Sequence, residues 1–161
     1  MVSASEFAKN PDPDSGFAES GSGFSYEVAQ PSPLAGDVEA AFQAAISGAA
    51  VQMEPAAFVS AWSARFSADE IGDLIVPRRT LARRLALREP LSNDEADRAI
   101  RAGRVSLEAD RVFGNPGKAH RWLRSANRTL NGQRPIDLLR SEAGTQIIFE
   151  RLGQIDHGMF V

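Results

Sequence analysis

The chain has 161 residues, of which 43% are hydrophobic and 24% charged, values typical of one compact domain or two small ones. It contains no cysteine, which excludes disulfides, thiolate metal sites and cysteine nucleophiles, and no apolar run approaches the ~18 residues that cross a membrane. The N-terminal residues lack the basic and apolar pattern of a signal peptide, so we expect a soluble, cytoplasmic protein.

Charge is distributed unevenly along the chain. Residues 1–74 hold two basic and eleven acidic side chains, whereas residues 75–105 hold eight arginines and four acidic residues. The rest holds eight basic and six acidic side chains, and the net charge is −3. The chain as a whole is therefore not a basic nucleic-acid binder, although its centre is basic.

Residues 1–35 are predicted to form a disordered arm. They contain four prolines among many Ser, Gly and Asp residues, and their apolar residues are isolated. Such a segment buries too little surface to offset the entropy of ordering it. Phe17, Phe24 and Tyr26 are the residues of the arm that are able to dock on another surface.

Helical periodicity and capping residues predict helices through the rest of the chain, and no segment alternates as a strand does. The predicted fold class is therefore all-α. The first helix is expected over residues 37–51, with an apolar face of Val38, Phe42, Ala45, Ile46 and Ala49. The second begins near Pro55 and presents Phe58, Val59, Trp62 and Phe66. Ser67 and Glu70 form a capping box that starts a short third helix.

A fourth helix is predicted over residues 77–87, after the tight connection Ile75-Val76-Pro77. We expect Leu81 and Leu85 to face inward and the four arginines of this helix to lie on its outer surface. A short helix, a turn and an arginine-rich helix have the layout of a helix-turn-helix, in which arginines contact phosphates and guanine edges. The predicted DNA-binding residues are Arg78, Arg79, Thr80, Arg83 and Arg84. The alternative is a solvated helix face that contacts no DNA.

Three further helices are expected. A long one is capped near Ser92 and reaches Phe113, and the next carries Ala119, Trp122, Leu123 and Ala126. A short helix opens at Pro135, and the last begins near Ser141, with Ile148, Leu152 and Ile155 on one stripe. We interpret Trp122 as a core anchor rather than an interface residue, and Gly132 and Gly144 as structural.

The sequence does not predict an enzyme. His120 and His157 have no second histidine at zinc-ligand spacing, and no Gly-x-Ser-x-Gly elbow occurs. The segment 114–118 lacks the upstream glycine and the following Ser or Thr of a phosphate-binding loop, so it is interpreted as a turn. We expect no cofactor, no metal and no small-molecule substrate.

A series of spaced anchors runs through the C-terminal block, residues 112–161. They are Val112-Phe113-Gly114, Ala119-x-x-Trp122-Leu123, Asn127, Leu130-x-Gly132, Pro135-x-x-Leu138-Leu139, Gly144 and Leu152-x-x-Ile155-x-x-Gly158. This pattern resembles the toxin-binding domain of the Xre/MbcA/ParS antitoxin family. Residues 77–84, with the helix start at Leu91-Ser92, are similar to the Xre-like helix-turn-helix of that family, and the resemblance covers roughly residues 55–161. Two positions depart from it: Ala126 stands where the family often has proline, and Ile75 replaces the usual turn glycine.

The resemblance implies an antitoxin of a type II toxin–antitoxin pair, whose usual partner is a RES-domain toxin that destroys NAD. Family members block the toxin by direct contact, tend to form homodimers and repress their own operon by binding operator DNA. On this basis we divide the chain into the arm (1–35), an Xre-like helical and dimerisation domain (36–111) and a small helical toxin-binding domain (112–161). The alternatives are a stand-alone helix-turn-helix transcriptional regulator and a purely structural helical module.

The last residues of the chain are apolar and follow the last predicted helix. Apolar chain ends are uncommon on soluble proteins unless they are buried. We expect the last helix and this tail to cover the active-site cleft of the toxin; the alternative is that the tail packs on the core of its own chain. The predicted toxin-binding residues are Arg151, Gln154, Ile155, Asp156, His157, Gly158, Met159, Phe160 and Val161.

Overall fold

The computed structural model of the protein describes residues 33–49 and 51–158, so most of the predicted arm and the last three residues lie outside the described part. Within it the chain forms seven α-helices and two 3-10 helices, and no strand. The predicted all-α fold class is confirmed. None of the described helices is long and apolar enough to cross a membrane.

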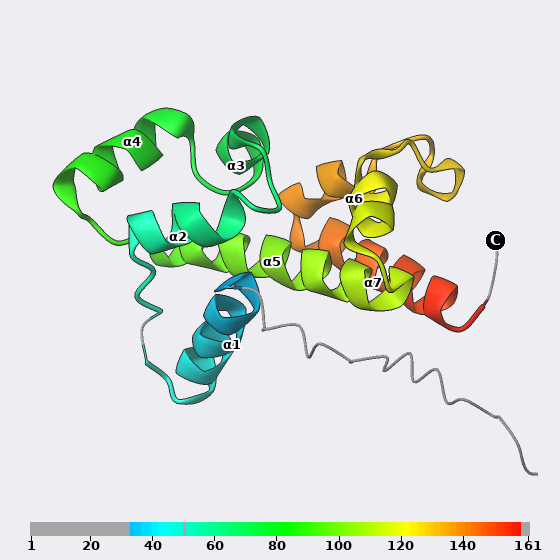
Figure 1. Cartoon of the computed structure of the whole chain (residues 1–161), viewed down its shortest axis with the longest axis horizontal. Helices are drawn as coiled ribbons and strands as arrows, with labels where there is room; N and C mark the ends of the chain where they lie inside the picture. The colour runs from blue at the N-terminus through cyan, green and yellow to red at the C-terminus, as the bar shows by residue number, and fades with distance from the viewer. Residues whose placement is uncertain (1–32, 50, 159–161) are drawn as a thin grey trace, which may run out of the picture.

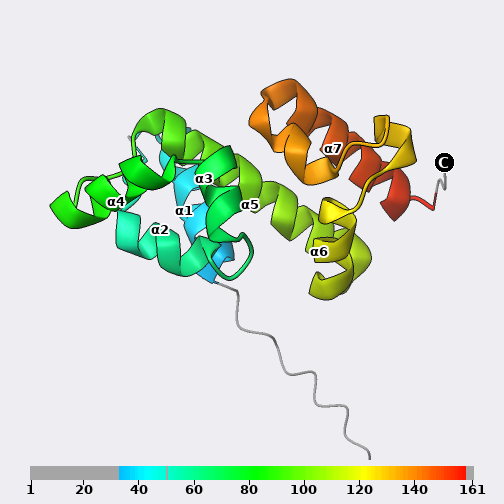
Figure 2. The same cartoon turned by 90° about the horizontal axis from the view of Figure 1, so that it is seen from above.

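The molecule is organised around one long helix, α5 (Asn93–Phe113), as Figure 1 shows. The helices that gather around its N-terminal part are α1 (Pro33–Ile46), α2 (Pro55–Trp62), α3 (Ala68–Leu74) and α4 (Arg78–Leu87). Those at its C-terminal part are α6 (Pro116–Arg124), the 3-10 helices η1 (Arg128–Leu130) and η2 (Pro135–Arg140), and α7 (Glu142–Asp156) (Figure 2). Helix α5 crosses residues 111 and 112 without a break, and the division into domains stays a prediction.

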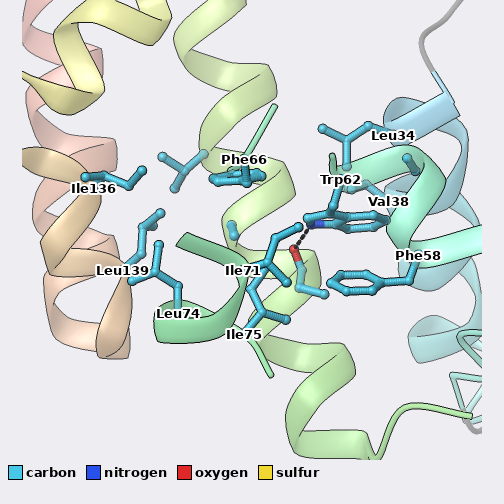
Figure 3. Packing of buried hydrophobic residues seen from close by; sticks show 14 of the residues in the cluster. Leu34, Val38, Phe58, Trp62, Phe66, Ile71, Leu74, Ile75, Ile136 and Leu139 are labelled. Carbon is cyan, nitrogen blue, oxygen red and sulfur yellow. Dashed lines mark hydrogen bonds between the residues drawn. The ribbon is translucent and has the colours of Figure 1, made fainter. Parts of the chain in front are cut away.

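One apolar core runs along α5 (Figure 3). On one side the rings of Phe58 and Trp62 lie together with centroids 5.1 Å apart, and the indole N–H of Trp62 donates a hydrogen bond to the carbonyl of Ala99 at 3.1 Å. On the other side apolar residues of α3 point toward those of η2, as Leu74 and Leu139 do. The helices before and after α5 therefore share the same core.

Helix α1 begins and ends earlier than the predicted 37–51. It begins at Pro33 because Leu34, 1% exposed, packs over Gly103 of α5, where an added Cβ would lie 3.3 Å from Leu34 Cδ1. It ends before Gly48, whose φ of +69° suits the left-handed stop of a helix. Ile46, predicted on the apolar face, is the last residue of α1 and is 67% exposed. Residues 33–35, predicted in the arm, are helical. The predicted contacts of Phe42 and Ala45 lie outside the described side chains.

The predicted starts of α3 and α5 are confirmed in detail. Ser67 and Glu70 at α3, and Ser92 and Glu95 at α5, each form a complete capping box. Two predicted helix ends are wrong: α2 stops before the buried Phe66, and α6 stops before Ala126. The short helix at residue 135 is a 3-10 helix.

Candidate functional site

Helix α7 is held tightly against the molecule at its N-terminal end. The Ser141 hydroxyl accepts a hydrogen bond from the Gly144 amide at 3.0 Å and caps the helix. A Cβ on Gly144 would lie 2.2 Å from the carbonyl oxygen of Leu138, so only glycine permits this approach of α7 to η2. The interpretation of Gly144 as structural is confirmed. Further along, Ile148 and Leu152 are fully buried, which fixes the face that α7 turns outward.

The outward side of α7 carries a partly apolar surface. Ile147, Arg151 and Gln154 recur at helical spacing on this side, next to the exposed Glu150. Ile147 is 40% exposed, and Arg151 Nη1 donates to Gln154 Oε1 at 2.7 Å. We call these four residues the α7 surface. Arg151 and Gln154 were predicted as toxin-binding, whereas Ile147 was missed. The adjacent isoleucines 147 and 148 held the signal, because a helix with one buried face buries only one of two neighbours.

The C-terminal end of α7 carries an exposed ion pair with α5. Asp156 forms an ion pair with Arg111 of α5 at 2.8 Å, and the hydrogen bond from Arg111 holds the pKa of Asp156 below its ordinary value. Ile155 is partly buried, His157 ends the helix and Gly158 has a φ of +68°. The predicted toxin-binding residues Met159, Phe160 and Val161 lie outside the described residues, so the structure places the surface that leads to the tail and not the tail.

A polar groove of about 310 Å³ lies beside this surface, between α5 and α7. Arg104 stands over the ring of Phe149, with its guanidinium carbon 5.4 Å from the ring centroid. Arg101 forms an ion pair with Glu142 at 3.5 Å across the same groove. These side chains were not predicted as functional, since their proximity arises only when α5 and α7 pack together.

Helix α4 presents most of its predicted DNA-binding residues to solvent. Arg78, Arg79 and Arg83 are exposed, and Thr80 is partly exposed. Arg78 pairs with Asp69 of α3, and Arg83 pairs with Glu89 at 2.8 Å, but both partners are well exposed, so these pairs are weak. No residue of α4 is buried. Leu85, predicted to face inward, is 41% exposed, which corrects that expectation.

Arg84 was predicted on the outer surface, and this placement is wrong. Its side chain is only 15% exposed and lies against the start of α5. Arg84 Nε lies 2.8 Å from Glu95 Oε2, and Arg84 Nη1 donates to the carbonyl of Pro90 at 2.6 Å. Arg84 therefore anchors α4 to α5 instead of facing a partner. The partner carboxylate is eleven residues away across a loop, which helix periodicity does not reveal.

The connection between α3 and α4 adopts ordinary backbone angles. Ile75, which departs from the usual turn glycine, has a φ of −117° and is 2% exposed. Arg98 of α5 donates to its carbonyl at 2.7 Å, and Val76 is fully buried. The turn is thus built on burial, and it requires no positive φ at Ile75.

An arginine of α6 connects the C-terminal block to α3. Arg124 hydrogen-bonds both carboxylate oxygens of Glu70, at 2.8 and 2.7 Å, and also donates to the carbonyl of Arg65. Burial by itself raises the pKa of Glu70, but the hydrogen bonds from Arg124 and from Ser67 outweigh it and hold the pKa below the ordinary value. Arg65 pairs with Asp110 nearby.

Within the described ranges, no three His, Asp or Glu side chains gather as they would around a metal ion.

Trp122 of α6 stacks on Phe113 at the end of α5, with ring centroids 5.6 Å apart. It is partly buried and packs against the core, which confirms its interpretation as a core anchor. Asn127 caps η1, and Gly132 has a φ of +80°, so the loop anchors of this block also serve the fold.

Part of this chain is similar in sequence to known proteins. Residues 108–158, which contain the end of α5 and all of α6, η1, η2 and α7, match the family described as the antitoxin Xre/MbcA/ParS C-terminal toxin-binding domain. The chain is 40% identical over 86 residues to the Antitoxin Xre of Pseudomonas putida, covering 53% of this chain and 54% of that protein. It is 31% identical over 86 residues to the Antitoxin Xre of Yersinia enterocolitica, covering 53% of this chain and 58% of that protein. The chain thus spans about half the length of these curated relatives.

Proposed function

We propose that the chain belongs to the Xre/MbcA/ParS antitoxin family, whose toxin-binding domain matches residues 108–158. It would then be the antitoxin of a toxin–antitoxin pair and bind its toxin through the α7 surface. One observation carries this proposal. Within the segment that matches a toxin-binding domain, α7 anchors one face in the core through Ile148 and Leu152 and leaves Ile147 and Arg151 outward. A fixed helix with a partly apolar outer side is suited to bind a protein partner.

The proposed partner is a RES-domain toxin that degrades NAD, as the family resemblance implies. Residues 158–161 are apolar and follow α7 directly, so a toxin seated on the α7 surface would meet them next. The tail and the end of α7 would then occupy the active-site cleft and exclude the substrate. Asp156 supports this placement, because its contact with Arg111 puts the end of α7 beside the end of α5.

The second part of the proposal is that the protein forms a homodimer and represses its own operon through α4. The supporting observation is the exposure of Arg78, Arg79 and Arg83 on a helix that follows a short helix and a buried turn. Arginines in this position bind phosphates and base edges. A stand-alone DNA-binding regulator without a toxin is the alternative function that this observation favours.

Co-purification with the protein encoded by the adjacent gene tests the antitoxin proposal, together with an assay of NAD loss. A stable complex that spares NAD supports the proposal. Failure to form a complex, with the activity of the neighbour unchanged, would leave the regulator as the better function.

Deletion of residues 158–161 should abolish protection in a chain that still folds; a truncated chain that protects fully contradicts occlusion by the tail.

Two substitutions at equally exposed aliphatic residues separate the two surfaces. Ile147 on α7 is 40% exposed and Leu85 on α4 is 41% exposed, so a change to Asp costs each a similar small amount of folding free energy. Ile147→Asp should weaken toxin binding about tenfold or more and leave DNA binding unchanged. Leu85→Asp should leave toxin binding unchanged. If both variants bind the toxin with equal affinity, the proposal that the toxin binds the α7 surface is contradicted.

Two arginines test operator binding in the same way. The double variant Arg79→Ala, Arg83→Ala should relieve repression without loss of neutralisation. It should also lower the dependence of DNA affinity on salt by about two phosphate contacts, measured by titration at several salt concentrations. Loss of both functions together would mean a folding defect, and unchanged DNA affinity would contradict a role of α4 in binding.

A further inference from the structure

Helix α4 exposes an unusual combination of side chains. Ala82, Leu85 and Ala86 are all exposed, and so are Arg78, Arg79 and Arg83 around them. We call these six residues the α4 face. Leu87 at the end of the helix is also 60% exposed. Apolar residues scattered singly on a surface need no explanation, but a helix with no buried residue and a row of exposed apolar side chains has a side free for an occupant.

The charges of the α4 face define the chemistry of that occupant. The ion pairs of Arg78 with Asp69 and of Arg83 with Glu89 join exposed side chains, so they exchange partners at little cost. A second copy of the same helix is a poor occupant, because its arginines would meet these arginines. The face instead fits an acidic segment that carries its own apolar or aromatic residues.

The chain contains such a segment before α1. Residues 1–32 hold five carboxylates and one lysine, and between the acidic positions stand the aromatic residues Phe17, Phe24 and Tyr26. This is the complement of the α4 face in both charge and apolarity. Reach is not limiting: the stretch from Asp12 to Pro33 spans up to about 70 Å when extended, at roughly 3.3 Å per residue. Helices α1 and α4 both lie around the N-terminal part of α5, which is about 30 Å long as a whole.

We propose that residues 12–27 bind the α4 face of their own chain, with the carboxylates on the arginines and the aromatic rings on Leu85 and its alanine neighbours. The bound segment covers the side chains that would contact phosphates. It therefore competes with operator DNA, a consequence that rests on the proposed DNA-binding function of α4. The segment occupies the place of the nucleic acid and thereby lowers the apparent affinity of the protein for operator DNA.

A spin label tests the contact without any DNA. The chain has no cysteine, so Ser22→Cys gives a single labelling site in the full-length protein. The amide signals of residues 78–87 should broaden strongly, and those of residues 146–154 in α7 should not. The broadening should fall when Phe17, Phe24 and Tyr26 are changed to Ala, and also at high salt, which screens the charges. Equal broadening in both helices, or broadening only between mixed labelled and unlabelled chains, would overturn binding within one chain.

DNA affinity tests the competition. The variant Asp12→Asn, Asp14→Asn, Glu19→Gln should bind a duplex of its own promoter about tenfold more tightly than the unchanged chain, measured by fluorescence anisotropy. The matched control makes the same change in charge at three exposed carboxylates outside the segment: Glu39→Gln, Asp97→Asn, Glu142→Gln. Equal affinity of the two variants overturns the competition. Absence of DNA binding in every variant would reject the proposed role of α4, and the spin-label result would still decide whether the segment binds there.

Discussion

Helices α4 and α7 carry the two surfaces proposed to bind partners, and they are held to α5 in opposite ways. Helix α7 buries Gly144, Thr145, Ile148 and Leu152, so packing fixes its orientation. Helix α4 buries no residue: Leu81 packs only partly against the core, and Arg84 makes polar contacts with Pro90 and Glu95. A partner of α7 thus meets a surface fixed by the core, while α4 has solvent on much of its surface.

The difference matches what the two proposed kinds of binding would require of their surfaces. A shape-specific protein contact benefits from a rigid, preorganised helix, since little conformational entropy is lost on binding. Contacts with an anionic partner depend more on the density of charge than on the exact placement of each side chain. The packing of α7 and the exposure of α4 follow this division.

The largest expected difference in stability comes from changing a leucine to alanine in each of the two helices. Leu152→Ala should lower the free energy of unfolding by about 3–4 kcal/mol, because the side chain is fully buried and its removal leaves a cavity. Leu85→Ala should cost less than about 0.5 kcal/mol, since that side chain is largely in solvent. Urea unfolding measures both. Similar losses for the two variants would break the comparison.

Two glycines of α7 should respond in opposite directions to the same change. Gly144→Ala should cost about 2–3 kcal/mol, because the added Cβ would meet the backbone carbonyl of Leu138, which cannot move aside. Gly153→Ala meets open space within a helix and should stabilise the protein by about 0.5–1 kcal/mol. Thermal unfolding of both variants decides this, and a stabilised Gly144→Ala would show that the approach of α7 to η2 is loose.

Arg84 is expected to matter for stability and Arg79 is not. Arg84→Ala should cost about 1–2 kcal/mol, because the buried carboxylate of Glu95 loses its counter-charge. Arg79→Ala should change stability by less than about 0.5 kcal/mol, since Arg79 is exposed and forms no ion pair within the described residues. Equal stability of the two variants in urea would mean that α4 is held by contacts other than Arg84.

The smallest effect is a dependence of stability on pH that arises from Glu70. Its pKa is lowered in the folded protein, so the charged carboxylate stabilises the fold above its ordinary pKa of about 4.5 and this contribution is lost as pH falls below that value. The difference in unfolding free energy between the unchanged chain and Glu70→Gln should therefore be present at pH 7 and shrink toward pH 3. In an Arg124→Ala background the difference should be smaller at pH 7. A difference independent of pH would mean that the carboxylate charge is not the cause.

Local sequence signals predicted the fold where local interactions decide it. The capping boxes at Ser67 and Ser92 and the core stripe of α7 depend on residues a few positions apart, and the structure confirms them. The predicted start of α1 was wrong because Leu34 packs against Gly103, which lies about seventy residues later in the chain. Arg84 was misplaced for the same reason, since its carboxylate belongs to the next helix.

The candidate site follows the same rule. Arg151 and Gln154 were predicted from their place near the end of the last helix; the structure puts them side by side, and their role in toxin binding stays a prediction. Ile147 was not predicted, although the predicted core stripe of Ile148 and Leu152 already implies that its neighbour Ile147 faces outward. The groove of Arg104 and Phe149 could not be predicted from the sequence, because it forms only when α5 and α7 pack against each other.

The stretch that matches the toxin-binding family begins at residue 108, within the last turns of α5. Residues of α5 before that point, Ala102 and Val105 among them, belong to the same core as Ile148 and Leu152. A fragment that begins at residue 108 would keep α7 and lose the part of α5 against which α7 packs. Anyone who grafts this module onto another scaffold must therefore carry most of α5 with it, because the portable unit is larger than its sequence signature.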